Sequence, residues 1–119
     1  PGSTPGLLDA CEAEDLPTLP GAATATEAMM LLERGYDMLK FFPAEASGGA
    51  PALMGIGAPL PQISFCPTGG VSTKNASSYL SLPNVLCAGG SWVAPVDLMK
   101  AGDWSGIENL AREASKLAT

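Results

Sequence analysis

The chain alternates short apolar runs with segments of helical pattern. This alternation is typical of β/α units, in which parallel strands lie side by side and helices cover the sheet. We expect four strands, at residues 16–20, 38–42, 62–67 and 84–88. We expect five helices, at residues 5–14, 24–35, 50–56, 72–80 and 105–117. The predicted fold class is therefore α/β, with one helix in front and a further helix after each strand.

Capping residues predict where two of these helices begin. Thr24 and Glu27 have the spacing of a capping box, in which each side chain bonds the backbone N–H of the other residue. Ser105 and Glu108 have the same spacing and predict the start of the last helix. Gly35 predicts the end of the second helix, because glycine readily adopts the left-handed conformation that closes a helix.

Side chains alternate between the two faces of a strand, so Ser64, Cys66 and Thr68 share one face of the third strand. A parallel barrel needs small or polar residues inside and bulky residues toward its helices. By the same period, Lys40 of the second strand points into the barrel. Such a barrel has eight units and about 250 residues. The 119 residues therefore supply about half of one barrel domain.

Lys40 is the least expected residue in this pattern, because it lies between Leu39 and Phe41 in an apolar strand. A lysine that loses water contact gives up its proton more readily, and the neutral amine is a nucleophile toward a carbonyl carbon. A second interpretation stays open: the ammonium group reaches the strand end or pairs with Glu45.

Composition narrows the classes of function. The net charge is −6 with no basic cluster, so we expect neither a nucleic-acid partner nor an anionic membrane partner. No apolar run is long enough to span a bilayer and no signal-peptide pattern opens the sequence. There is no histidine, and the three cysteines are widely spaced, so we expect no metal site and reduced thiols in the cytoplasm. Cys66 and Cys87 are interpreted as small core residues.

Glycine-rich turns follow the last two expected strands. Gly69 and Gly70 close the third strand, and Gly90 and Ser91 follow the fourth. Two such turns on neighbouring strands are a common phosphate site, because backbone N–H groups can approach the anion closely. Either turn alone would indicate only a tight turn, and we interpret the pair at residues 48–49 in that way.

Three further residues lie near these strand ends and have two interpretations each. Thr68 either bonds a substrate carboxylate or hydroxyl, or caps its strand. Phe42 either forms an apolar wall beside the lysine or belongs to the barrel core. Glu45 is interpreted as a surface or loop-fixing carboxylate rather than as a catalytic base.

These motifs closely resemble the bacterial 2-keto-3-deoxy-6-phosphogluconate (KDPG) and 4-hydroxy-2-oxoglutarate aldolase family. The matching segments are residues 40–45, 48–49, 65–71 and 89–92, and the similarity extends over nearly the whole chain. The resemblance implies a (β/α)8 barrel of which residues 1–119 are the carboxyl-terminal part, with about the last four β/α units. It also implies a trimer and a metal-independent class I aldolase without a cofactor. Its substrate would be a phosphorylated 2-keto acid, cleaved to pyruvate and glyceraldehyde 3-phosphate.

The resemblance also implies roles for single residues. Lys40 matches the lysine that forms the Schiff base. Pro1, Phe42 and Thr68 match residues of the pyruvate end of the pocket. The matches to the phosphate-binding turns are Gly69, Gly70, Gly90 and Ser91.

The family's proton-moving glutamate and carboxylate-binding arginine belong to its first four strands, which this chain lacks. The sequence is then either part of a longer record or a half-barrel, natural or engineered. A non-catalytic half-barrel that keeps the phosphate turns is the alternative function. A third reading is an aldolase that prefers a phosphate-free hydroxy-keto acid.

Overall fold

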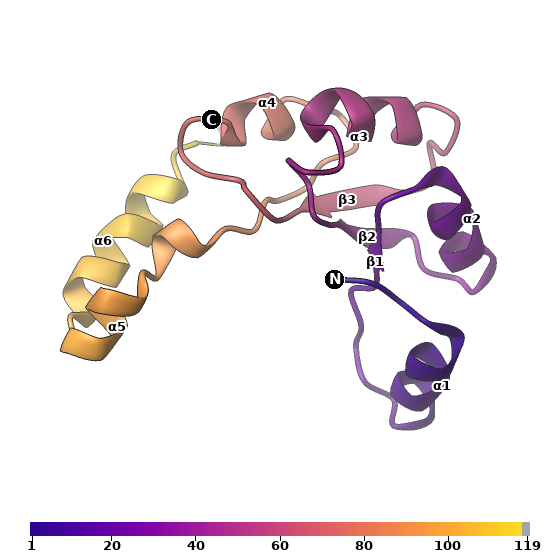
Figure 1. Ribbon diagram of the computed structural model, residues 1–119, viewed down its shortest axis with the longest axis horizontal. Helices are drawn as coiled ribbons and strands as arrows, with labels where there is room; N and C mark the ends of the chain where they lie inside the picture. The colour runs from indigo at the N-terminus through magenta and orange to yellow at the C-terminus, as the bar shows by residue number, and fades with distance from the viewer. Residues whose placement is uncertain (118–119) are drawn as a thin grey trace.

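Three parallel strands form the centre of the structure, in the order β1–β2–β3 (Figure 1). They are β1 (Gly21–Ala22), β2 (Met38–Phe41) and β3 (Ser64–Pro67). In this computed structural model, which describes residues 1–117, Lys40 pairs with Gly21 on one side and with Cys66 on the other. The predicted parallel β/α arrangement is confirmed for these strands. The last two residues of the predicted 1–119 domain lie outside the described part of the chain.

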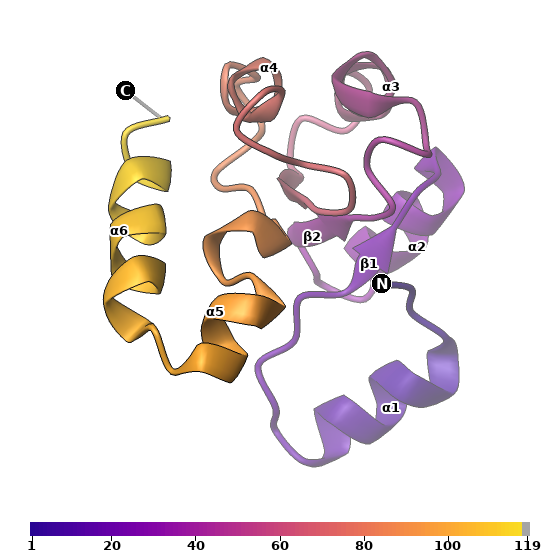
Figure 2. The same cartoon turned by 60° about the vertical axis from the view of Figure 1, so that its left-hand side comes forward.

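Helices lie before, between and after the strands. They are α1 (Pro5–Ala13), α2 (Ala25–Glu33), α3 (Gly49–Gly57), α4 (Ala76–Leu80), α5 (Val96–Ala101) and α6 (Trp104–Ala114), with a short 3-10 helix, η1 (Ser91–Val93). All five predicted helices form, although α4 is shorter than expected. The sequence patterns did not predict α5 and η1. Figure 2 shows α5 and α6 side by side, and Figure 1 shows that this pair extends away from the sheet and its covering helices.

One of the two predicted capping boxes is present. The Thr24 hydroxyl accepts a hydrogen bond from the backbone N–H of Glu27, and the Glu27 carboxylate accepts one from the backbone N–H of Thr24. The second prediction, at Ser105 and Glu108, is wrong. Helix α6 begins two residues earlier than a Ser105 cap would place it, because the Asp103 carboxylate caps it by accepting from the backbone N–H of Gly106 at 2.9 Å.

The first and fourth predicted strands differ from the structure. Strand β1 begins at Gly21 rather than at residue 16, in a stretch where Pro17 and Pro20 have no N–H to donate to a ladder. Residues 84–88 form no named strand, and this prediction is wrong. They make an isolated bridge from Val85 to Phe65, and Gly89 makes another to Thr68. Phe65 and Thr68 are three residues apart, whereas their partners Val85 and Gly89 are four apart, so the two bridges do not share one register.

The two faces of β2 have different environments. Leu39 and Phe41 are completely buried, and they belong to a core that includes Phe65 and Leu53. On the opposite face Lys40 is half-buried. The bulky residues therefore face the covering helices, as predicted, and Lys40 lies on the face that would line a barrel.

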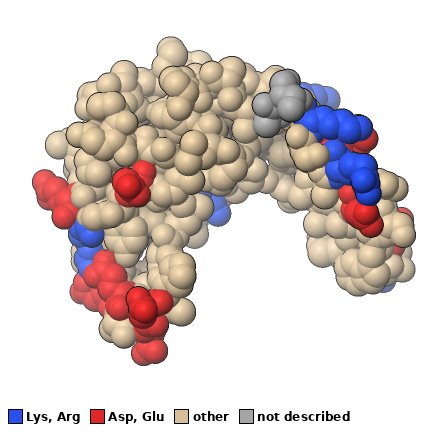
Figure 3. Space-filling view, turned by 180° about the vertical axis from the view of Figure 1, so that it is seen from behind, with Lys and Arg blue, Asp and Glu red and all other residues tan. Residues whose placement is uncertain are grey.

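Charged side chains gather mainly at two ends of the molecule on the face shown in Figure 3, and most of the surface between them is uncharged. Among the ion pairs, Arg34 pairs with Asp9 and Glu12, and Arg112 pairs with Glu108. No helix within residues 1–117 has the length and apolar character needed to cross a membrane.

Replacing Phe41 tests whether the buried side of β2 holds the sheet together. We expect Phe41→Ala to lower the free energy of unfolding by about 3–5 kcal/mol, because it leaves a cavity in the core. Urea denaturation measures this change. Met30→Ala is the control, because Met30 is 54% exposed, and it should cost less than about 1 kcal/mol. Equal effects of the two substitutions would contradict the described core.

Candidate functional site

The two predicted glycine turns border one hollow at the carboxyl ends of the strands. Its volume is about 520 Å³. The residues that line it are Phe42, Thr68, Gly69, Gly70, Val71, Ser72, Gly90, Ser91 and Trp92. We call it the glycine-turn hollow. All four residues predicted to hold phosphate line it, together with Phe42 and Thr68.

Backbone conformation explains why glycine occupies the first turn. Gly69 has φ +97° and Gly70 has φ +78°, a left-handed region that costs other residues roughly 1–2 kcal/mol. Space is also limited, because a Cβ atom at Gly70 would lie 2.7 Å from Cγ of Glu45. The pair at residues 48–49 also has positive φ, in agreement with its interpretation as a turn.

Backbone N–H groups of both turns are available to a ligand. Within residues 1–117 the N–H groups of Gly69, Gly70 and Gly90 donate no hydrogen bond to another part of the chain. Ser91 adds a hydroxyl beside them on an exposed residue. A hollow with free N–H donors and a hydroxyl suits an anion with several oxygen acceptors.

Thr68 joins the two turns. Its backbone N–H donates to the carbonyl of Phe41 at 2.9 Å, and it forms a bridge with Gly89. A Cβ atom at Gly89 would lie 2.6 Å from the Thr68 hydroxyl oxygen, so only glycine leaves that hydroxyl in place. The Thr68 hydroxyl lies 3.9 Å from the sulfur of Cys66.

Lys40 lies two residues before Phe42, on the inner face of β2. Its Nζ is 5.3 Å from the centre of the Phe42 ring, within the range of a cation–π contact. Lys40 makes no ion pair with the described carboxylates, and Glu45 instead accepts a hydrogen bond from Tyr79. The interpretation that Lys40 pairs with Glu45 is therefore wrong, and Glu45 does fix a loop.

Pro1 lies beside the strand next to Lys40. A Cβ atom at Gly21 would lie 2.0 Å from the Pro1 carbonyl oxygen, and Gly21 is the strand neighbour of Lys40. Neither Pro1 nor Lys40 lines the glycine-turn hollow. The structure therefore gathers six of the eight predicted site residues in one hollow and places Lys40 and Pro1 on neighbouring parts of the sheet.

Several residues near the hollow were missed from the sequence. The Asn75 amide donates to the Gly70 carbonyl at 3.0 Å and accepts from the backbone N–H of Ser72 at 2.7 Å. The Ser72–Asn75 spacing is that of a capping box with asparagine in place of the usual Glu or Gln, which is the signal available for the contact with Ser72. Trp92 also lines the hollow, and its indole nitrogen is buried without a hydrogen-bond partner within residues 1–117.

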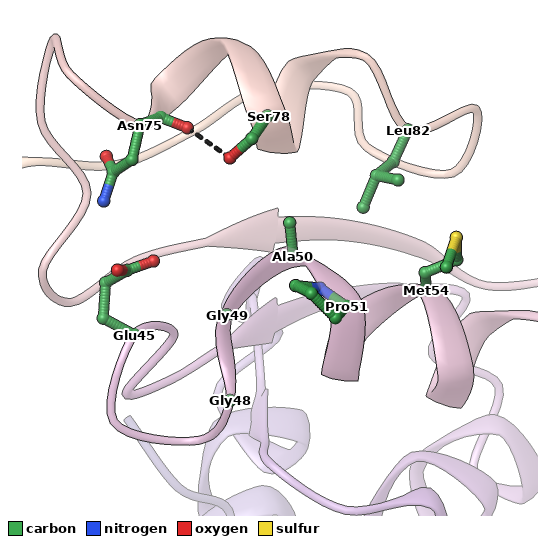
Figure 4. Close-up of a pocket in the computed structure, with 9 residues that line it drawn as sticks. All are labelled: Glu45, Gly48, Gly49, Ala50, Pro51, Met54, Asn75, Ser78 and Leu82. Atoms are coloured by element: carbon green, nitrogen blue, oxygen red, sulfur yellow. Dashed lines mark hydrogen bonds between the residues drawn. The ribbon is translucent and has the colours of Figure 1, made fainter.

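Helices α3 and α4 border a second hollow of about 650 Å³ (Figure 4). Glu45 and Asn75 lie on its opposite sides, and the hydroxyl of Ser78 donates to the backbone carbonyl of Asn75. We call it the α3–α4 groove.

The cysteines show no arrangement for a metal. Within the described residues no group of three or more His, Cys, Asp or Glu side chains is placed to hold an ion. Cys66 is buried, as interpreted, but Cys87 is exposed, so the core interpretation of Cys87 is wrong. Partial burial, and then the neighbouring Cys66 thiol, raise the pKa of Cys87, which favours its protonated form.

Comparison with known proteins identifies the family. The sequence model of the family described as KDPG and KHG aldolase matches residues 1–110. The chain belongs to this family. It is 54% identical over 114 residues to 2-dehydro-3-deoxy-phosphogluconate aldolase of Pseudoalteromonas atlantica, covering 96% of this chain and 53% of the relative. It is 49% identical over 114 residues to KHG/KDPG aldolase of Escherichia coli, a match that covers 96% of this chain and 54% of the relative.

Solved structures of KDPG aldolases also match this chain. KDPG aldolase from Legionella pneumophila, with pyruvate captured as a covalent carbinolamine intermediate, superimposes with a TM-score of 0.90 at 46% identity over 96% of this chain and 55% of that one. The structure of the Zymomonas mobilis enzyme with 3-phosphoglycerate superimposes with a TM-score of 0.86 at 43% identity. The match covers 97% of this chain and 54% of that one. The chain spans about half the length of the relatives it matches. The predicted family is confirmed, as is the α/β fold of about half a barrel.

Gly70→Ala tests the close packing of the first turn. We expect it to lower the free energy of unfolding by at least about 1 kcal/mol more than Gly35→Ala, because a tight contact adds to the backbone strain. Gly35 is a matched control, since its φ is +93° and a Cβ atom there would meet nothing within 4 Å. Urea denaturation of both variants gives the comparison, and equal losses would show that Glu45 does not crowd Gly70.

Proposed function

We propose that this chain is the lysine-bearing, carboxyl-terminal part of a (β/α)8-barrel class I aldolase. The enzyme cleaves 2-keto-3-deoxy-6-phosphogluconate to pyruvate and glyceraldehyde 3-phosphate, and also acts on 4-hydroxy-2-oxoglutarate. The observation that carries the proposal is the position of Lys40 on the inner face of β2, where it forms no ion pair within residues 1–117. Its Nζ contacts the ring of Phe42, and Phe42 lines the hollow whose N–H donors make no hydrogen bond within those residues. The names of the relatives support the substrate, and the pyruvate adduct of the Legionella enzyme supports the covalent chemistry.

In the proposed reaction, neutral Nζ of Lys40 attacks the keto carbon and forms a carbinolamine. Loss of water then gives a protonated imine. A base takes the proton of the substrate hydroxyl next to the breaking carbon–carbon bond, and the cation accepts the electron pair of that bond, so the aldehyde leaves and an enamine remains on Lys40. Protonation of the enamine and hydrolysis of the imine release pyruvate and restore the lysine.

Other residues bind the two ends of the substrate. Thr68 bonds the pyruvate end, Phe42 forms an apolar wall beside Lys40, and Pro1 lines the same end of the pocket. The phosphate lies in the glycine-turn hollow, bound by the backbone of residues 69–70 and 90 and by the Ser91 hydroxyl. The proton-moving glutamate and the carboxylate-binding arginine come from the preceding strands. Glu45 is not that base, since it is engaged with Tyr79.

The complete enzyme would be a cytoplasmic homotrimer that requires no cofactor, and its partner is the phosphorylated 2-keto acid. One observation favours the alternative of a half-barrel that binds phosphate without catalysis. Nine residues of this chain already line the glycine-turn hollow. A designed protein cage built from fused oligomeric domains is also similar, with a TM-score of 0.72 at 28% identity, so an engineered scaffold is the other form of this alternative.

Lys40 variants separate the aldolase from the binding module. In the complete protein, we expect Lys40→Ala and Lys40→Arg to reduce cleavage of 2-keto-3-deoxy-6-phosphogluconate at least a thousandfold, roughly, because neither side chain forms the imine. Coupled release of pyruvate measures the rate. Binding of 3-phosphoglycerate, the control, should change by less than about twofold, since Lys40 does not line the hollow. Retained turnover in either variant would refute the assignment.

Ser91→Glu tests the position of the phosphate. The added carboxylate should raise the KM for the phosphorylated substrate by about tenfold or more through like-charge repulsion. The KM for phosphate-free 4-hydroxy-2-oxoglutarate should stay within about twofold. Ser81→Glu, at an exposed residue outside the hollow, is the control. An equal loss for both substrates would show that Ser91 does not face the phosphate.

A further inference from the structure

We propose that Tyr79 and Glu45 form a brace that positions the Gly69–Gly70 turn, so that both act as positioning residues for the phosphate of the substrate. The inference rests on the proposed phosphate site and adds two residues that do not line the glycine-turn hollow.

The brace joins α4 to the loop after the lysine strand. Tyr79 lies on α4 and is completely buried. Its hydroxyl donates a hydrogen bond to Oε1 of Glu45, which is 34 residues away in sequence. Burial, and then the hydrogen bond with Glu45, raise the pKa of Tyr79, so its hydroxyl stays protonated and remains a donor.

Glu45 transmits this anchor to the turn through two contacts. Its backbone N–H donates to the Gly69 carbonyl at 3.0 Å. Its side chain lies against Gly70, since a Cβ atom there would be 2.8 Å from Cβ and 2.7 Å from Cγ of Glu45. The direction of the Gly70 backbone therefore depends on where the Glu45 side chain is held.

The N-terminal end of helix α4 also contacts the Gly69–Gly70 turn. Asn75, the residue before α4, donates its amide to the Gly70 carbonyl at 3.0 Å. Figure 4 shows Glu45 and Asn75 on opposite sides of the α3–α4 groove. Gly70 is thus fixed by α4 twice, directly through Asn75 and through the Tyr79–Glu45 pair.

Loss of the brace should weaken phosphate binding and leave imine formation at Lys40 unchanged. Phosphate binding needs the N–H groups of Gly69 and Gly70 aimed at one point, so a small rotation of the turn weakens it. Lys40 is positioned independently by its strand, where its backbone N–H donates to the Pro20 carbonyl at 2.8 Å.

Tyr79→Phe in the complete protein is the direct test, because it removes only the hydroxyl. We expect the KM for 2-keto-3-deoxy-6-phosphogluconate and the Kd for 3-phosphoglycerate to rise about tenfold. The kcat, and the KM for 4-hydroxy-2-oxoglutarate, should stay within about twofold. Tyr36→Phe is a matched control, since its hydroxyl donates to Oε1 of Glu12 at 3.0 Å on the α1 side of the molecule.

Glu45 variants keep the test decisive if Tyr79→Phe fails to fold. Glu45→Gln retains an oxygen that accepts from Tyr79 and should bind 3-phosphoglycerate nearly as the unaltered protein does. Glu45→Ala should show at least the tenfold loss, roughly, because it removes both the hydrogen bond and the Cγ contact with Gly70. Adding Tyr79→Phe to it should change little, because the hydrogen bond is already lost.

The outcomes separate this inference from the proposed function. If the unaltered protein binds 3-phosphoglycerate and cleaves its substrate, but Tyr79→Phe and Glu45→Ala leave phosphate affinity unchanged, the brace is refuted and the function stands. Equal loss on both substrates with a lower Tm would also refute it, because that indicates general destabilisation. If the unaltered protein neither binds nor cleaves, the proposed function fails and the brace fails with it.

Discussion

The parallel pairing of β2 with β3 is the interaction on which the rest of the structure depends. It places Lys40 beside Cys66 and continues past the named strands, where the Thr68 N–H donates to Phe41 and the Ala44 N–H donates to Thr68. The same ladder directs Phe41 into the core and Lys40 to the inner face. Because strand side chains alternate, one register determines both the packing and the site.

Local chemistry made much of this predictable. The Thr24–Glu27 capping box, the end of α2 at Gly35 and the inward face of Lys40 follow from contacts within a few residues, or from the period of a strand. The glycine turns were predicted for the same reason, since positive φ at residues 69–70 nearly requires glycine. The two turns lie together because parallel strands end at one edge of the sheet.

Other features depend on long-range contacts, and the sequence patterns did not predict them. Val85 has an apolar, strand-like setting, but its segment makes only isolated bridges. Asp103, and not Ser105, caps α6, and the spacing of these two polar residues in the sequence does not indicate which of them is the cap. The Tyr79–Glu45 contact joins residues 34 positions apart, and no local pattern indicates it. Cys87 was interpreted as core from its type alone, and it is exposed.

The central claim is that Lys40 is the nucleophile of a Schiff-base aldolase, and borohydride trapping with pyruvate tests it most directly. The protein is incubated with pyruvate, reduced and digested, and the modified peptide is located by mass spectrometry. The account predicts a reduced pyruvyl adduct on Lys40, absent from Lys74 and Lys100, which serve as internal controls. A complete, folded protein that gives no adduct, or one modified at another lysine, would contradict the account.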